Sequence, residues 1–251
     1  MNISFSVGIF PFVRALLMRF AVLCAALVYS NTVALLLGMW IVFAIQPAWS
    51  ALQIDITKGG LQPLPIAIPT FVDLSSGGQI LPNGDMGRQV ADVVSADLQR
   101  SGLFQPLDRK AFLQDAKVLW RSGPQFRDWR LIGADAVVAG GVRQDDRQVT
   151  VDFFLYDVFQ GGLLGKGKRF TASNENWRHV AQRVADEIYT RLTGEGGYFS
   201  SRIAFISRQG KKKKLAIMDQ DGANRVDLTN GKSLVLTPRF SPDGEYLFYL
   251  S

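Results

Sequence analysis

The chain has 251 residues, of which 28 are Lys or Arg and 22 are Asp or Glu, and its formal net charge is +6. Two basic residues, Arg14 and Arg19, lie in the first 50 positions, so the remainder has 26 basic and 22 acidic residues, a charge of +4. This mild excess gives no indication of nucleic-acid binding, which requires a strong basic face. The single cysteine, Cys24, lies near the N-terminus, so positions 51–251 offer no disulfide and no thiolate chemistry.

Residues 1–50 are typical of an export signal. Arg14 and Arg19 precede a long apolar run, and Ala48 and Ser50 supply the small residues that signal peptidase requires before a cleavage site. We expect cleavage after Ser50. The run is also long enough to span a bilayer, so an uncleaved membrane segment is the alternative. Either interpretation places the rest of the chain outside the cytoplasm.

Residues 51–198 are predicted to form a small α/β domain. It begins with a segment at 51–60 in which Leu52, Ile54 and Ile56 alternate with polar residues, which indicates a short strand or an extended arm. Residues 65–74 are predicted to form one buried strand, with Pro69 placing it at an edge or a bulge. The polar stretch at 103–135 carries no predicted element.

Two amphipathic helices and a hairpin complete this domain. The first helix begins after Asp85 as N-cap and ends at Gly102, and its apolar residues recur at spacings of three and four. The second begins at Trp177 and ends at Gly194. Three strands are expected between them, at 136–143, 149–159 and 169–172. Helices packed against a mixed sheet make an α/β domain.

Residues 199–251 are predicted to be the start of a β-propeller. Ile203–Ser207 aligns with Leu247–Ser251 at an offset of 44 residues, close to the period of about 40–45 of a four-stranded blade. Ser241–Gly244 has the sequence of a tight turn. We expect one blade and the beginning of the next, so the chain is predicted to be truncated or part of a longer product. A small β-appendage is the alternative.

No catalytic, cofactor or metal site is predicted. His179, the only histidine, is expected at the surface of the second helix, and no Gly-x-Ser-x-Gly motif occurs. A zinc site would need at least two carboxylate ligands, which is an uncommon set. Gly162–Lys168 has the spacing of a phosphate-binding loop, but Arg169 follows where that motif has Ser or Thr, and the segment joins two predicted strands. Gly231–Ser233 lacks the first glycine of the motif.

The remaining conspicuous residues are predicted to be structural. Lys211–Lys214 is expected to be a solvated hairpin tip, with a contact to an acidic partner or an anionic lipid head group as the alternative. Asp145 and Asp146 are likewise expected at a hairpin tip. Trp120, Trp129 and Trp177 are predicted to pack within or between domains, and sugar binding is the alternative for them.

Three stretches resemble the TolB family of the Tol–Pal system of Gram-negative bacteria. They are Ala96–Arg109 (ADLQRSGLFQPLDR), Asp128–Val142 (DWRLIGADAVVAGGV) and Arg202–Ser251 with its Ser-Pro-Asp-Gly turn. The turn alone occurs in many propellers, whereas the three stretches in this order are specific. The resemblance covers nearly all of residues 51–251.

The resemblance implies a periplasmic adaptor without enzymatic activity, which supports outer-membrane integrity and constriction during cell division. It implies that the N-terminal arm binds the inner-membrane protein TolA and that the propeller binds the lipoprotein Pal. Carried over by position, the TolA-binding residues are Leu52, Gln53, Ile54, Asp55, Ile56 and Thr57. Such an alternating arm is suited to adding a strand to the edge of a partner's sheet. Contact with membranes would occur only through partners or an uncleaved signal.

Two other functions stay open at this point. Propeller-containing exported serine peptidases also carry the Ser-Pro-Asp-Gly repeat, so the chain could be the N-terminal part of such an enzyme. Such enzymes carry a serine elbow and its histidine in a hydrolase domain that follows the propeller, and no Gly-x-Ser-x-Gly elbow occurs in these 251 residues. A membrane-anchored sensor is the third possibility if residues 1–50 stay uncleaved.

Overall fold

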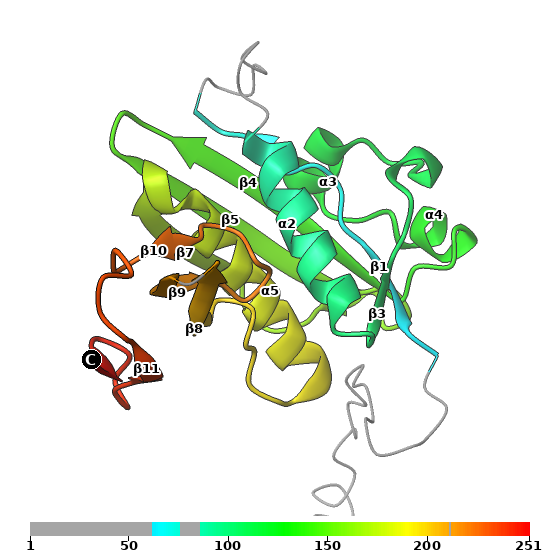
Figure 1. The fold of residues 1–251 in the computed structure, drawn as a ribbon. Coiled ribbons are helices and arrows are strands. Elements are labelled where there is room, and N and C mark those ends of the chain that lie inside the picture. The colour runs from blue at the N-terminus through cyan, green and yellow to red at the C-terminus, as the bar shows by residue number, and fades with distance from the viewer. Residues whose placement is uncertain (1–61, 76–85, 211) are drawn as a thin grey trace, which may run out of the picture. The chain divides into compact units, whose positions relative to one another are not determined.

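The computed structural model describes residues 62–75, 86–210 and 212–251. The predicted export signal or membrane segment (1–50), the predicted arm (51–60) with Leu52–Thr57, the predicted cap Asp85, and Lys211 lie outside the described residues. Among the described residues, no helix has the length and apolar character needed to cross a membrane. The described elements form two parts: a sheet with helices comes first along the chain, and a C-terminal part made of strands follows it (Figure 1).

A mixed sheet forms the centre of the first part. Its strands are β1 (Leu64–Ala67), β2 (Val72–Asp73), β3 (Phe104–Pro106), β4 (Ala136–Gln144), β5 (Gln148–Asp157), β6 (Gly162–Leu163) and β7 (Lys168–Ser173). The order is β3-β1-β4-β5-β6, while β2 also pairs with β4 and β7 also pairs with β5. The β1, β2 and β3 pairings are parallel, and those of β5 with β4, β6 and β7 are antiparallel. The predicted hairpin is the β4–β5 pair, with Asp145 at its tip.

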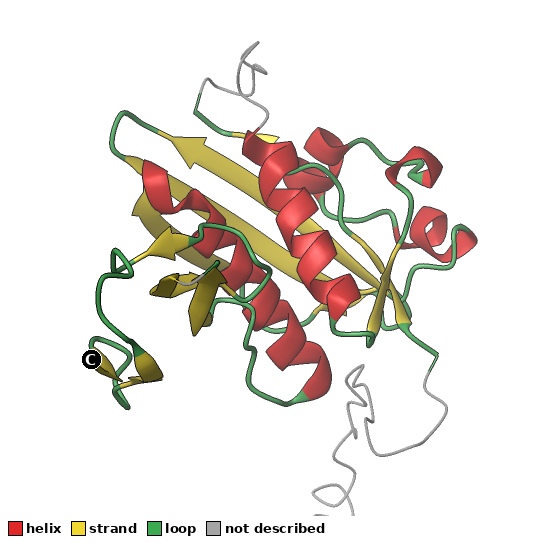
Figure 2. Ribbon diagram, in the orientation of Figure 1, coloured by secondary structure: helices red, strands yellow, loops and turns green. Residues whose placement is uncertain are grey.

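Helices cover both faces of this sheet, as Figure 2 shows. They are α2 (Met86–Arg100), α3 (Ala116–Ser122), α4 (Phe126–Leu131) and α5 (Trp177–Thr193), with short 3-10 turns η1 (Arg109–Ala111) and η2 (Asn174–Asn176). Helices α2 and α5 lie side by side on one face, and α3 and α4 lie on the other. The two long helices match the predicted ones in extent.

The alternation of β5 divides the core between the two faces. Val151, Phe153 and Leu155 are fully buried in the larger cluster, which they share with α2 and α5. Phe154 and Tyr156 point to the opposite face and pack against a smaller cluster centred on Trp129 of α4. Both faces of β5 are therefore covered at Phe153–Tyr156, where its sequence is continuously apolar, whereas Thr150 and Asp152 earlier in the strand are polar and only partly buried.

The prediction of one strand over residues 65–74 is wrong. The run is divided into β1 and β2, and Pro69 lies in the break between them because proline cannot donate a ladder hydrogen bond. The break lets Phe71 pack across β4, where a Cβ on Gly140 would lie 2.3 Å from the Phe71 ring. The same segment meets α2, since the Phe71 N–H donates to the Gly87 carbonyl at 3.2 Å.

The stretch at 103–135, which carries no predicted element, contains β3, α3 and α4. Helix α3 is stabilised at its N-terminus by Asp115, whose Oδ1 accepts the N–H of Lys117 at 2.8 Å. It ends at Gly123 with φ +77°. Buried Gln114 holds the two helices together, because its Oε1 accepts the N–H of Gln125 and the indole N–H of Trp129 at 2.9 and 2.8 Å.

The C-terminal part contains two antiparallel sheets in the described residues. The first comprises β8 (Arg202–Gln209), β9 (Lys212–Asp219) and β10 (Val226–Asp227), and the second comprises β11 (Leu236–Phe240) and β12 (Leu247–Leu250). The expected blade of four strands therefore has three here. Strand β11, which the sequence analysis does not predict, pairs with β12, and the Ser241–Gly244 turn joins the two strands directly, with the Ser241 N–H donating to the Tyr246 carbonyl at 2.9 Å.

Candidate functional site: the junction between the α/β domain and the propeller start

The chain leaves α5 through a short segment that is tied back onto the same helix. Gly194 ends α5 in the left-handed conformation at φ +78°. The Asp186 carboxylate then accepts the N–H groups of Phe199 and Ser200 at 2.6 and 3.1 Å. Phe199 is fully buried, and its ring meets that of Tyr189 at 5.6 Å in a T-shaped arrangement. The connection between the two parts is therefore packed rather than loose.

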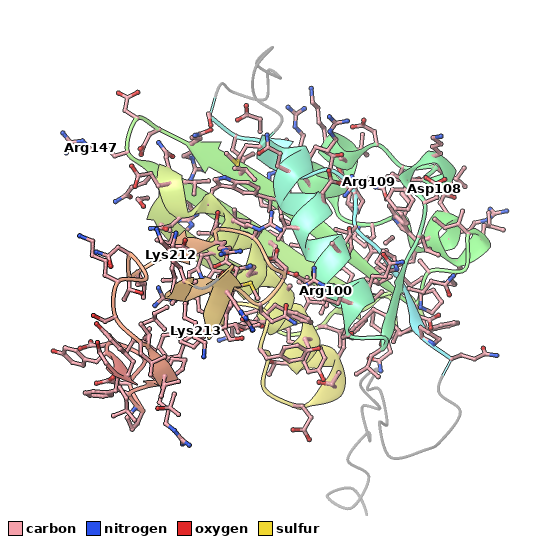
Figure 3. All side chains as sticks on the ribbon, viewed as in Figure 1. Arg100, Asp108, Arg109, Arg147, Lys212 and Lys213 are labelled. Atoms are coloured by element: carbon pink, nitrogen blue, oxygen red, sulfur yellow. The ribbon has the colours of Figure 1, made fainter. Side chains whose placement is uncertain are left out.

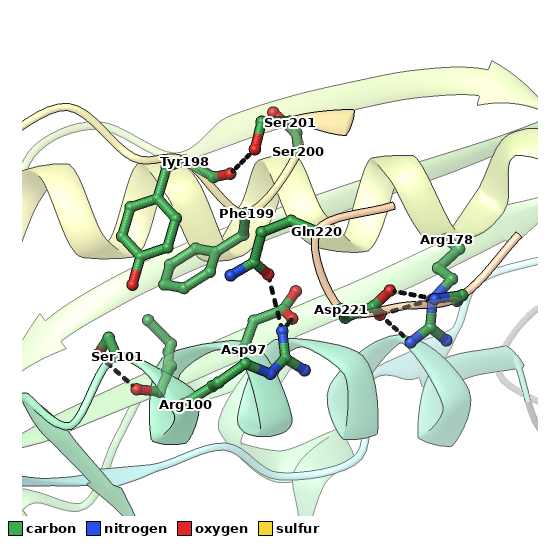
Figure 4. A network of polar contacts seen from close by, with 12 residues as sticks. Asp97, Arg100, Ser101, Arg178, Tyr198, Phe199, Ser200, Ser201, Gln220 and Asp221 are labelled. Carbon is green, nitrogen blue, oxygen red and sulfur yellow. Dashed lines mark hydrogen bonds and ion pairs between the residues drawn. The ribbon is translucent and has the colours of Figure 1, made fainter. Parts of the chain in front are cut away.

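The turn between β9 and β10 contacts the α/β domain through Asp221 (Figure 4). Arg178, in the first turn of α5, donates its Nε to Asp221 Oδ2 at 3.0 Å and forms an ion pair with it through Nη2. The Asp221 side chain is only 2% exposed, and its other oxygen accepts the Ala223 N–H at 2.9 Å. Burial by itself raises the pKa of Asp221, but the Ala223 N–H and the Arg178 guanidinium outweigh it and hold the pKa below its ordinary value.

A second contact joins the same turn to α2. Arg100 Nη1 lies 2.8 Å from Gln220 Oε1 and 3.0 Å from Asp97 Oδ1, so one guanidinium connects helix and turn (Figure 4). Asp97 is fully buried, and its Oδ2 has no hydrogen-bond partner within the described part of the chain. Burial raises the pKa of Asp97 to about 6, although Arg100 opposes the shift. A buried carboxyl group with one unpaired oxygen is therefore part of the junction.

A cleft of about 450 Å³ also lies at this junction. Its walls come from η2, α5 and the strands of the propeller start, and they include Glu175, His179, Arg202 and Asp219. His179 is at the surface, as predicted, but it lines the cleft, and partial desolvation there together with the charge of Arg183 lowers its pKa. Within residues 62–75, 86–210 and 212–251, no group of three or more His, Cys, Asp or Glu side chains could hold a metal ion.

The tryptophans, the glycine-rich segment and the lysine run named in the sequence analysis lie in the core, in a turn and in a strand. Trp129 is buried, and Trp120 packs against Phe154 with ring centroids 5.5 Å apart. The glycine-rich segment at 162–168 joins β6 to β7, so no helix follows it as a phosphate-binding loop would require. The prediction that Lys211–Lys214 forms a hairpin tip is wrong for its described residues, because Lys212–Lys214 are the first residues of β9.

The junction residues Asp97, Arg100, Arg178 and Asp221 are not singled out by the sequence analysis. For Asp97 a signal exists, since it falls on the apolar side of its helix, three residues after Val94 and next to Leu98. A charged residue at such a position indicates a buried polar group with a specific partner. Arg178 and Asp221 are 43 residues apart and have no comparable signal.

These features define a class of protein, in which an α/β domain is packed closely against the start of a β-propeller. Residues 52–164 match the family described as the TolB amino-terminal domain, and residues 189–251 match the TolB beta propeller domain. The chain belongs to the TolB family. Its predicted fold class is thereby confirmed.

Relatives and a solved structure agree with this assignment. Proteins named Tol-Pal system protein TolB from Paramagnetospirillum magneticum and Pelagibacter ubique are 48% and 45% identical, over 84% and 86% of this chain and 46% and 50% of their own lengths. The crystal structure of TolB from Acinetobacter baumannii superposes with a TM-score of 0.62 at 28% identity, covering 80% of this chain and 47% of that one. The chain thus spans about half the length of the curated relatives it matches.

Proposed function

We propose that this protein is a periplasmic adaptor of the Tol–Pal system that binds protein partners and performs no reaction. The observation that carries the proposal is the 48% identity to a protein named Tol-Pal system protein TolB over 84% of the chain. None of the three curated relatives compared has the name of an enzyme. The adaptor links TolA at the inner membrane with Pal at the outer membrane, and so maintains outer-membrane integrity and constriction during cell division.

In this proposal the arm Leu52–Thr57 is the TolA-binding segment. Leu52, Ile54 and Ile56 alternate with Gln53, Asp55 and Thr57, so an extended arm presents one apolar face and one polar face. Backbone groups of such an arm can complete the hydrogen bonds of a partner's edge strand, while the apolar side chains enter its surface. Pal binding is assigned to the propeller, of which residues 199–251 form the start.

The packed junction supports an adaptor whose two parts act together. The Arg178–Asp221 ion pair and the Arg100–Gln220 hydrogen bond fix the β9–β10 turn to both long helices of the α/β domain. A partner that binds one part therefore meets a surface whose position relative to the other part is held by specific polar contacts.

Titration calorimetry with the periplasmic part of TolA tests the proposal. We expect binding by the full chain and a loss of more than tenfold in affinity for Ile54→Asp/Ile56→Asp, because the apolar face of the arm is removed. Ile203→Asp/Leu228→Asp is the matched control, since these apolar side chains are exposed in the propeller start, and it should bind normally. Equal affinity for all three proteins, or no binding by the unaltered chain, would refute the assignment.

A further inference from the structure

Basic residues are concentrated in the propeller start. Residues 51–198 contain seventeen basic and seventeen acidic residues, whereas residues 199–251 contain nine basic and five acidic ones. The charge of +4 in positions 51–251 therefore comes entirely from the second part. No acidic residue occurs from Ile203 to Met218, which is the β8–β9 hairpin without its two end residues, Arg202 and Asp219.

The hairpin brings like charges together. In its antiparallel register Arg208 lies opposite Lys213, and both side chains are exposed. Like charges directly opposite each other on neighbouring strands destabilise the pair. Arg208 donates its Nε to the Gly210 carbonyl at 3.0 Å, a contact that leaves its charge uncompensated.

A second turn adds a further cation beside the hairpin. A Cβ on Gly231 would lie 3.2 Å from Lys212 Cβ and from Lys214 Cγ, so the turn that contains Lys232 packs on the beginning of β9. Lys214 forms an ion pair with Asp227, in which Nζ lies 2.9 Å from Oδ2. Lys212, Lys213 and Lys232 form no ion pair with another described residue, and all three are exposed. Successive strand residues point to opposite faces, so Lys212 and Lys232 lie on one face of the hairpin and Arg208 and Lys213 on the other, all near its turn. Arg208, Lys212, Lys213 and Lys232 are called the basic patch below, and Figure 3 labels two of its lysines.

We infer that the basic patch is a docking surface for anionic phospholipid. The chemistry of its residues favours lipid over an acidic protein. Lysine is depleted from protein–protein interfaces, where arginine and aromatic residues are enriched. Clusters of lysine, by contrast, are attracted to anionic lipid by about 1 kcal/mol for each residue near the surface.

The geometry agrees with attraction to a surface rather than to a single ligand. None of the four basic-patch residues lines the cleft at the junction or the second cleft beside α2 and α3. Because the four side chains surround the end of one hairpin, they can approach a plane of head groups when the hairpin meets it end-on, without an enclosing pocket. The patch therefore orients the propeller start toward an anionic membrane surface, and this inference does not depend on the proposed partners.

Vesicle flotation of the full chain tests the inference, with phosphatidylethanolamine vesicles that contain or lack phosphatidylglycerol. Residues 1–50 are the same in every variant, so lipid is kept below saturation and the ratio of binding to anionic and to neutral vesicles is compared between variants. Lys212→Gln/Lys213→Gln should bind the anionic vesicles roughly 30-fold more weakly, at about 1 kcal/mol for each lost charge. Lys212→Arg/Lys213→Arg should bind as the unaltered chain does, since the charge is kept.

The matched control is Lys110→Gln/Lys166→Gln, which removes the same charge from exposed lysines of the α/β domain. We expect less than a threefold change for this control, and we expect the preference for anionic vesicles to disappear in 1 M salt, where the Debye length is about 3 Å. Equal weakening by both pairs of substitutions would overturn the inference, because only net charge would then matter. Equal binding of the unaltered and Lys212→Gln/Lys213→Gln proteins would overturn it as well.

Discussion

Replacing Arg178 by Ala should loosen the propeller start from the α/β domain. The substitution leaves the Asp221 carboxylate, whose side chain is 2% exposed, with the Ala223 N–H as its remaining hydrogen-bond donor. Removing one partner of a fully buried ion pair costs about 3–5 kcal/mol. Arg178 is itself 27% exposed, so water can reach part of the site, and we expect a smaller loss of about 2 kcal/mol.

A double-mutant cycle with Arg178→Ala and Asp221→Ala measures the coupling directly. Urea unfolding should give a coupling free energy of about 1–2 kcal/mol. Hydrogen exchange should show faster opening of β9 and β10, while the amides of α2 and α5 keep most of their protection. Arg183→Ala is the control on the same helix, because Arg183 lies over the Phe170 ring at 4.5 Å and forms no ion pair with another described residue.

A coupling free energy below about 0.5 kcal/mol would refute this reasoning, because that value is typical of an exposed ion pair. The same conclusion would follow if Arg178→Ala and Arg183→Ala changed the exchange of β9 and β10 equally. Either result would mean that the junction is held by the aromatic packing around Phe199 and that its polar contacts contribute little.

Three further predictions concern stability, each measured by urea unfolding. Burial raises the folded-state pKa of Asp97 from 3.8 to about 6, so the stability that its protonated form contributes is present below pH 4 and is lost as the pH rises to 6. The free energy of unfolding of Asp97→Asn, relative to that of the unaltered chain, should therefore increase by up to about 3 kcal/mol between pH 4 and pH 7. No change in that difference would contradict the burial argument. Gly140→Ala should cost about 1–3 kcal/mol, since its Cβ would meet the Phe71 ring at 2.3 Å; Gly196→Ala, where a Cβ meets nothing within 4 Å, is its control. Gln114→Ala should cost about 2–3 kcal/mol, because the Trp129 indole N–H is left buried without an acceptor, and a cost below 0.5 kcal/mol would contradict this role.

The sequence predicts the long elements of the α/β domain because their patterns are local. Val90, Val94 and Leu98 recur with the period of a helix, and the β4–β5 hairpin has apolar runs on both sides of Asp145. Short elements are missed because their stability depends on distant contacts. Helix α3 has only Leu119 buried and is secured through Gln114 and its neighbours, so apolar periodicity gives no signal there.

The candidate site is less accessible to sequence reasoning than the fold. The two residues of the Arg178–Asp221 pair come from a helix and from a turn of the propeller start, so only the folded chain brings them together. The offset of 44 residues indicates a propeller start but not how many strands its first sheet has, because a repeat period does not determine which strands pair. The arm at Leu52–Thr57 lies outside the described residues, and its role stays a prediction.

Site-specific photocross-linking in cells tests the proposed adaptor function most directly. A photoreactive amino acid is placed at Ile54, in the predicted arm, or at exposed Lys110 of the α/β domain as the control position. We predict an adduct between the arm position and TolA that is absent from the control position and that disappears when Ile56→Asp is added. No adduct with TolA from position 54, or equal adducts from both positions, would contradict the account.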